Sequence, residues 1–222
     1  MTSRAETSTE TVDVRDMIVV HTAMLREFRL LPALLRGTSG ADTGRRALVA
    51  GHIRFLCDLL HHHHEGEDEL LWPLLEQRAP ATVQEWVEVM HDQHDRLDTL
   101  LTDVRRELDV WERSPDQLAA DRLTELHAAL VEHLDLEERE VLPVAAVTVT
   151  TREWHAIGEA AVAALPKPRL PLVFGMFMHE GDPQVLTDML RTAPLVPRLL
   201  MPRIAPRVYA RYARRVHGTA TP

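Results

Sequence analysis

The sequence predicts an all-α fold: an antiparallel up-down-up-down four-helix bundle followed by a C-terminal extension that is helical or irregular. The composition favours helices over strands, because leucine, alanine, valine, glutamate and arginine are abundant while aromatic residues make up 5% of the 222 residues. Four long segments also place apolar residues three or four positions apart, the spacing that puts them on one helix face. An apolar fraction of 45% is sufficient for a buried core.

Each of the four segments is bounded by residues that end or begin helices. A Gly-Thr-Ser-Gly turn at 37–40 follows the first segment, and Ala-Pro at 79–80 follows the second. Ser-Pro-Asp at 114–116 opens the fourth as a cap with a proline just inside the helix start. Connections this short between long helices favour antiparallel neighbours. The apolar stripes of the four segments run over residues 14–35, 55–74, 83–111 and 123–141, and the helices are expected to extend to the breaks between them.

Charge and cysteine content restrict the partners and the location. The net charge of −9 argues against nucleic acid as a partner. Residues 1–151 carry 15 basic against 29 acidic side chains, a net charge of −14, while residues 152–222 carry 10 against 5, a net charge of +5. A single cysteine, Cys57, and a polar N-terminus without an apolar core are what we expect of a cytoplasmic protein.

Polar residues interrupt the apolar stripe of every predicted helix. A buried carboxylate without a partner costs several kcal/mol, roughly, so it is seldom kept without a purpose. Counted from the loops, all the interruptions fall near mid-helix, so they would meet at one level of an antiparallel bundle. The residues are His21, His63, Glu67, His94, His133 and Glu137.

The chain also repeats itself at an offset of 70 residues (91 − 21 and 133 − 63). Two helical hairpins related by a pseudo-twofold axis are the simplest explanation. The repeat adds His91 to the candidate residues, and it aligns His94 with Met24, so the first hairpin is expected to supply one histidine fewer. The matched pairs are His21 with His91, His63 with His133, Glu67 with Glu137, Asp68 with Glu138 and Pro73 with Pro143.

This combination of residues is suited to binding metal. His63 and Glu67, like His133 and Glu137, are four positions apart, so each pair points an imidazole and a carboxylate to the same side of a helix. Nitrogen and oxygen ligands together suit iron or manganese in a bundle core. Zinc is less favoured, because structural zinc takes four ligands and usually cysteine.

The spacing His21 … His63-x3-Glu67-Asp68 … His91-x2-His94 … His133-x3-Glu137-Glu138 resembles the hemerythrin superfamily, in particular the bacterial HHE cation-binding domains. The resemblance covers residues 12–146 and implies two iron ions per chain. It implies one iron on His91, His94 and His133 and the other on His21 and His63. Glu67 and a carboxylate of the fourth helix would bridge the two ions.

Several assignments stay open. Oxygen-carrying hemerythrins have three residues between their two third-helix histidines, whereas two separate His91 and His94. Their fourth-helix bridge is an aspartate five positions after the fourth-helix histidine, where this chain has Glu138; the His-x3-Glu form resembles iron-sensing relatives. Glu137 lies on the stripe and is preferred over Glu138 as the bridge. His64 and Asp68 are candidates for an additional ligand or an outer contact. The other histidines are expected at the surface or at helix ends: His52, His61, His62, His127, His155, His179 and His217.

The leading functional hypothesis is a di-iron protein that binds oxygen or a related small diatomic or peroxide ligand. Turnover of peroxide or nitric oxide, and an iron or redox sensor, are the alternatives, and no feature of the sequence separates them. The basic extension at 152–222 is amphipathic toward its end and could contact an anionic membrane surface. Packing on the acidic bundle is preferred, because the two parts carry opposite net charge.

Overall fold

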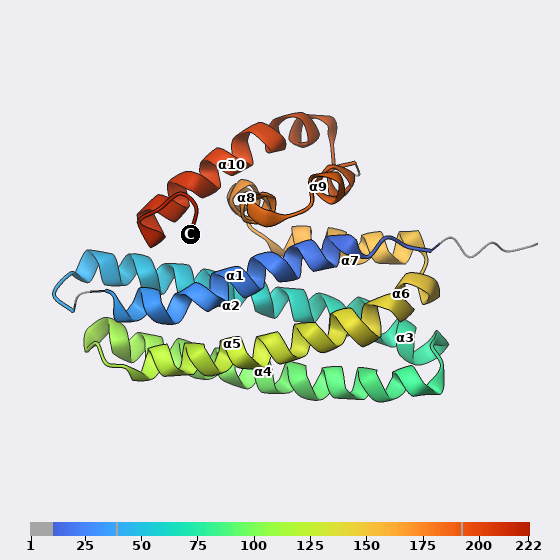
Figure 1. Cartoon of the computed structure of the whole chain (residues 1–222), viewed down its shortest axis with the longest axis horizontal. Helices are drawn as coiled ribbons and strands as arrows, with labels where there is room; N and C mark the ends of the chain where they lie inside the picture. The colour runs from blue at the N-terminus through green and yellow to red at the C-terminus, as the bar shows by residue number, and fades with distance from the viewer. Residues whose placement is uncertain (1–10, 39, 192) are drawn as a thin grey trace, which may run out of the picture.

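The computed structural model describes residues 11–38, 40–191 and 193–222, and its described elements are all helical, as the sequence predicts. The four long helices of the bundle lie side by side, with neighbours antiparallel (Figure 1). Shorter elements complete this bundle and form the extension. The bundle consists of α1 (Arg15–Arg36), α2 (Thr43–Leu70), α3 (Trp72–Arg78), α4 (Ala81–Arg113), α5 (Leu118–Leu136), the π-helical turn η1 (Glu137–Val141) and α6 (Leu142–Thr148). The extension consists of α7 (Thr151–Ala164), the 3-10 turn η2 (Lys167–Arg169), α8 (Leu170–Glu180), α9 (Pro183–Met189) and α10 (Leu195–His217).

The helix ends follow the expected local chemistry with small shifts. The Asp42 carboxylate accepts a hydrogen bond from the Arg45 backbone N–H at 2.8 Å and caps α2, which begins at Thr43, just after the predicted turn. The fourth long helix begins at Leu118 rather than at the predicted proline, and the Asp116 carboxylate accepts from the Leu118 backbone N–H. Of the predicted 37–40 turn, Ser39 lies outside the described residues.

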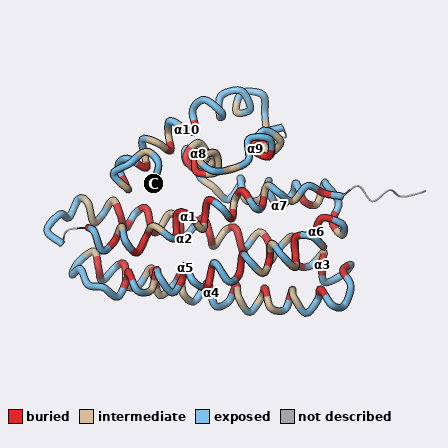
Figure 2. The backbone as a smooth tube through the Cα atoms, in the orientation of Figure 1, coloured by how far each residue is buried: buried red, intermediate tan, exposed pale blue. Residues whose placement is uncertain are grey.

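The apolar core of the bundle is divided into two parts by a polar layer. On α1, Met17 belongs to one part and Met24 to the other; on α4, Met90 and Leu97 are divided in the same way. Figure 2 shows buried residues on the inner faces of the bundle helices along their length. The polar side chains in this layer are therefore enclosed by packed apolar residues on both sides.

The C-terminal extension packs on one side of the bundle, against α1 and α2 (Figure 1). Leu172, Val173 and Met176 of α8 are buried in the same apolar cluster as bundle residues. Gly175 permits α8 and α10 to pack closely, because a Cβ there would lie 2.3 Å from the Ala205 carbonyl oxygen.

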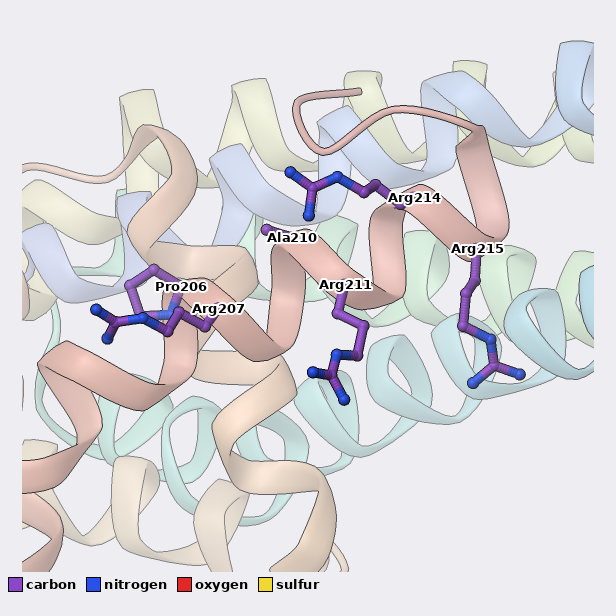
Figure 3. A pocket seen from close by; sticks show the side chains of 6 residues that line it. All are labelled: Pro206, Arg207, Ala210, Arg211, Arg214 and Arg215. Atoms are coloured by element: carbon purple, nitrogen blue, oxygen red, sulfur yellow. The ribbon is translucent and has the colours of Figure 1, made fainter.

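Among the described residues, the opposite charges of the extension and the bundle do not appear as ion pairs from the arginines that line one groove of α10. Arginines of α10 line an open groove of about 570 Å³ (Figure 3). None of the groove's arginines forms an ion pair with a described carboxylate of the bundle. Apolar packing is the main contact seen, while these arginines face away from it. The groove residues are Pro206, Arg207, Ala210, Arg211, Arg214 and Arg215. Within the described part of the chain, no helix combines the length and apolar character needed to cross a membrane.

Candidate metal centre

Four histidines, one from each long helix, meet in the polar layer and form two pairs. The Nε2 atoms of His21 on α1 and His63 on α2 are 3.1 Å apart. Those of His94 on α4 and His133 on α5 are 3.2 Å apart. All four side chains are buried, and each pair comes from the two helices of one hairpin.

Two glutamates lie between the pairs. The Oε1 and Oε2 atoms of Glu67 lie 3.3 Å from His63 Nε2 and 3.6 Å from His94 Nε2, respectively. Glu137 Oε2 lies 3.5 Å from His21 Nε2 and 3.8 Å from His133 Nε2. Each carboxylate thus contacts one histidine of each pair.

Neither carboxylate forms a hydrogen bond with any described residue, although both are fully buried. Burial, together with the charges of Glu137 and Asp68, holds the pKa of Glu67 well above its ordinary value. Burial also raises the pKa of Glu137. For the histidines, burial lowers the pKa of His133 to about 2, and His63 is shifted in the same direction. Buried carboxylates without hydrogen-bond donors, surrounded by imidazole nitrogens, make a site that a cation would stabilise.

Outer contacts turn the histidines toward this centre. His21 Nδ1 lies 2.9 Å from Glu138 Oε1, and His94 Nδ1 lies 2.7 Å from Asp68 Oδ1. His133 Nδ1 lies 3.0 Å from the side-chain oxygen of Gln93. Each of these oxygens can accept a hydrogen bond from the Nδ1–H of its histidine, which leaves Nε2 free to bind metal. Asp68 and Glu138 occupy this outer position, and Gln93 is a residue that sequence reasoning did not single out.

The turn after Glu137 is a π-helical segment. The Leu142 backbone N–H donates to the carbonyl of Glu137, five residues back, and Pro143, next in the chain, has no N–H to donate. Isolated π-helical turns are often found at functional sites. Here the wider turn begins at Glu137. The Glu137 carboxylate contacts His21 Nε2 within the centre, and the Glu138 carboxylate contacts His21 Nδ1 from outside it.

The model of the family described as "Hemerythrin HHE cation binding domain" matches residues 12–145. The chain belongs to the hemerythrin family. No curated protein and no solved structure matches the chain in the corresponding comparisons. Hemerythrin domains bind metal ions, typically iron, and the unpaired Glu67 and Glu137 oxygens among four imidazoles fit such an ion.

The structure does not bring His91 into the hemerythrin centre. Its side chain is 44% exposed and contacts Glu76 Oε1 at 3.2 Å and Asp68 Oδ1 at 3.7 Å. On α4 the inward positions belong to Met90 and His94, and His91 lies beside them. The ligand set implied by the resemblance therefore differs at this position from the cluster that the structure forms.

His91 lies outside the cluster because the first helices of the two hairpins, α1 and α4, correspond at a different sequence offset from the second helices, α2 and α5. His94, not His91, is the counterpart of His21, since their Nδ1 atoms contact Asp68 and Glu138, which correspond in the repeat. The paired histidines are 42 residues apart in the first hairpin and 39 in the second. The offset of 70 therefore holds for the second helix of each hairpin and not for the first. The alignment of Met24 with His94 fails for the same reason.

His64 breaks the pseudo-twofold symmetry of the hemerythrin centre. It is buried, its ring stacks on His94 with centroids 4.2 Å apart, and neither ring nitrogen has a hydrogen-bond partner among the described residues. His64, Glu67, His94 and His133 each offer a ligand atom within 4.8 Å of the others. The counterpart of His64 in the repeat is Leu134, an apolar residue of the core.

Proposed function

We propose that the centre holds two iron ions and binds oxygen or a related small oxidant such as peroxide or nitric oxide. His21 and His63 hold one ion, while His94 and His133, with His64, hold the other. Glu67 and Glu137 bridge the two. The observation that supports two ions is the position of each buried carboxylate, which contacts a histidine of both pairs.

The polar layer contains more potential metal ligands than a single ion can bind. Seven nitrogen and carboxylate groups converge, and their mixed character suits iron. The carboxylates also balance the charge that metal brings into an apolar core, where an uncompensated charge would be costly. The apolar residues on both sides of the polar layer exclude water from it.

The centre is asymmetric, and this supports an open position on one side. His64 adds a third imidazole to the side of His94 and His133, whereas His21 and His63 have no such addition. A bound di-iron centre supplies redox chemistry toward oxygen or peroxide. The small ligand is therefore expected beside His21 and His63, where the chain offers fewer groups.

A second candidate, an iron sensor, is supported by the extension. α8 and α10 pack against α1 and α2, the helices that carry His21 and His63. Loss of metal from His21 and His63 would loosen α1 and α2, and would thereby weaken the packing of the extension against these helices. Faster proteolysis of residues 152–222 in the metal-free protein would favour the sensor.

Metal analysis with visible spectroscopy tests the proposal. Freshly purified, unchelated protein should contain about two iron atoms per chain, and azide should add a visible band to the diferric form. Iron at or below one per chain, or no spectral change with azide, would contradict it. Consumption of peroxide or nitric oxide over many turnovers would identify an enzyme rather than a carrier.

A further inference from the structure

Three residues distant in the sequence meet where the extension covers the bundle: Glu27 of α1, His52 of α2 and His217 at the end of α10. Glu27 Oε2 lies 3.7 Å from His52 Nε2 and 3.5 Å from His217 Nε2. The three side chains are 1%, 0% and 6% exposed, respectively. This cluster shares no residue with the hemerythrin centre.

The three converging atoms have no hydrogen-bond partner among the described residues, whereas the outer atoms of Glu27 and His52 do. Glu27 Oε1 accepts from the Tyr209 hydroxyl at 2.6 Å and from Arg26 at 3.0 Å. His52 Nδ1 lies 3.1 Å from the Tyr212 hydroxyl oxygen. Leaving a buried polar atom unpaired costs about 1–3 kcal/mol, so three that face one another indicate a missing partner.

We propose that Glu27, His52 and His217 form a second, mononuclear metal site that binds a divalent ion of the zinc type and fastens the extension to the bundle. Two imidazoles and one carboxylate are a ligand set that zinc uses in proteins. The distances of 3.5 and 3.7 Å from Glu27 to the two histidines are close to the separation of about 3.4 Å between ligands at about 2.1 Å around a tetrahedral ion.

The protonation of the groups agrees with this assignment. Burial lowers the pKa of His52 to about 4, so its imidazole is uncharged at neutral pH. Burial alone would raise the pKa of Glu27, but His217, Tyr209, His52 and Arg26 outweigh it and lower that pKa to about 2. An anionic carboxylate and a neutral imidazole are the forms that bind metal.

His217 is held in position independently of any ion. The Arg45 guanidinium donates to the backbone carbonyl of Arg215 at 2.5 Å and to that of Val216. The helix then ends at Gly218, whose φ of 80° is the left-handed conformation that glycine adopts readily. The third ligand is therefore presented by a fixed helix end, and binding requires little rearrangement.

Zinc binding to the iron-loaded, full-length protein tests the proposal. With the hemerythrin centre filled with iron, titration calorimetry should find one further zinc ion per chain. The affinity for that zinc should fall at least about 100-fold in His217→Ala and in Glu27→Gln, with iron content unchanged. His155→Ala, a substitution of an exposed α7 histidine, is the control and should bind zinc as wild type does.

Cobalt in place of zinc gives a second readout, since a four-coordinate cobalt ion should add visible bands that His217→Ala lacks. No zinc uptake beyond the iron centre, or unchanged zinc affinity in His217→Ala, would overturn the proposal. Iron lost together with zinc in both variants would also count against it, because the residues would then act through the fold. Failure of the di-iron proposal would appear separately, in the iron content of the wild type.

Discussion

Replacing Glu67 by glutamine tests whether the Glu67 carboxylate is a ligand shared by the two histidine pairs. Glutamine has nearly the same volume and keeps one carbonyl oxygen, but it carries no charge and is a weaker ligand for iron. In the structure Glu67 contacts one histidine of each pair, at 3.3 and 3.6 Å, so its loss should affect both ions. Glu65 provides the matched control, because its side chain is 50% exposed and pairs with His62, outside the centre.

The size of the effect follows from the coupling of binding and folding. At an iron concentration about 100 times the Kd, each bound ion stabilises the fold by about 2.7 kcal/mol, or about 5 kcal/mol for two. A change of 1 kcal/mol shifts the Tm of a protein of this size by about 2–4 °C, so iron should raise the wild-type Tm by about 10–20 °C. Glu67→Gln should keep less than about half of that increase, and Glu65→Gln all of it.

Thermal unfolding with and without iron, followed by circular dichroism and paired with iron analysis, measures this difference. Metal-free Glu67→Gln should be at least as stable as the metal-free wild type, because the substitution removes a buried carboxylate that no described residue hydrogen-bonds. Equal iron content and equal iron-dependent stabilisation in both variants would refute the bridging role. A metal-free variant clearly less stable than metal-free wild type would show that Glu67 acts through packing.

Three further predictions concern other parts of the chain. His94→Ala should lose iron while His91→Ala keeps it, because only His94 is buried in the cluster; iron analysis of both distinguishes this structure from the spacing of the repeat. Gly175→Ala should destabilise the fold by about 1–3 kcal/mol and speed proteolysis of the extension, because the added Cβ would clash with α10. Gly158→Ala is the control: the space around Gly158 is open, so alanine should stabilise α7 by up to about 1 kcal/mol. Urea unfolding of the two variants measures both effects. Burial raises the pKa of the Cys57 thiol to about 12, so this group should react with a thiol reagent at pH 8 only as fast as the protein unfolds, and rapid labelling of native protein would contradict its burial.

The sequence was sufficient for the helices and for the level at which the polar residues meet. Helical periodicity is local, so the apolar stripe of α4 predicted the buried face from Val83 to Trp111 directly. The same stripe marks His94 as inward, because its neighbours three and four positions away, Leu97 and Met90, are apolar and buried. The family was also recognisable, since its motif combines short spacings of histidine and glutamate on each of the four helices, which can be read without knowing how the helices pack.

What the sequence could not determine depends on how helices are placed against one another. The position of His91 was inferred from the offset of 70 residues, which holds only for the second helix of each hairpin. The packed bundle shows that the first helices, α1 and α4, correspond at an offset of 73 residues instead (94 − 21 against 91 − 21). The role of His64 within a run of four histidines is likewise decided by the rotation of α2 in the bundle.

The cluster of Glu27, His52 and His217 had no signal in the sequence at all. No periodicity or motif relates a histidine near the C-terminus to residues on α1 and α2, so these histidines were expected at the surface or at helix ends. The close packing of α8 on α10 and of both on the bundle brings them together. Local periodicity determines which residues face inward, but contacts between residues distant in the chain arise only when the helices pack.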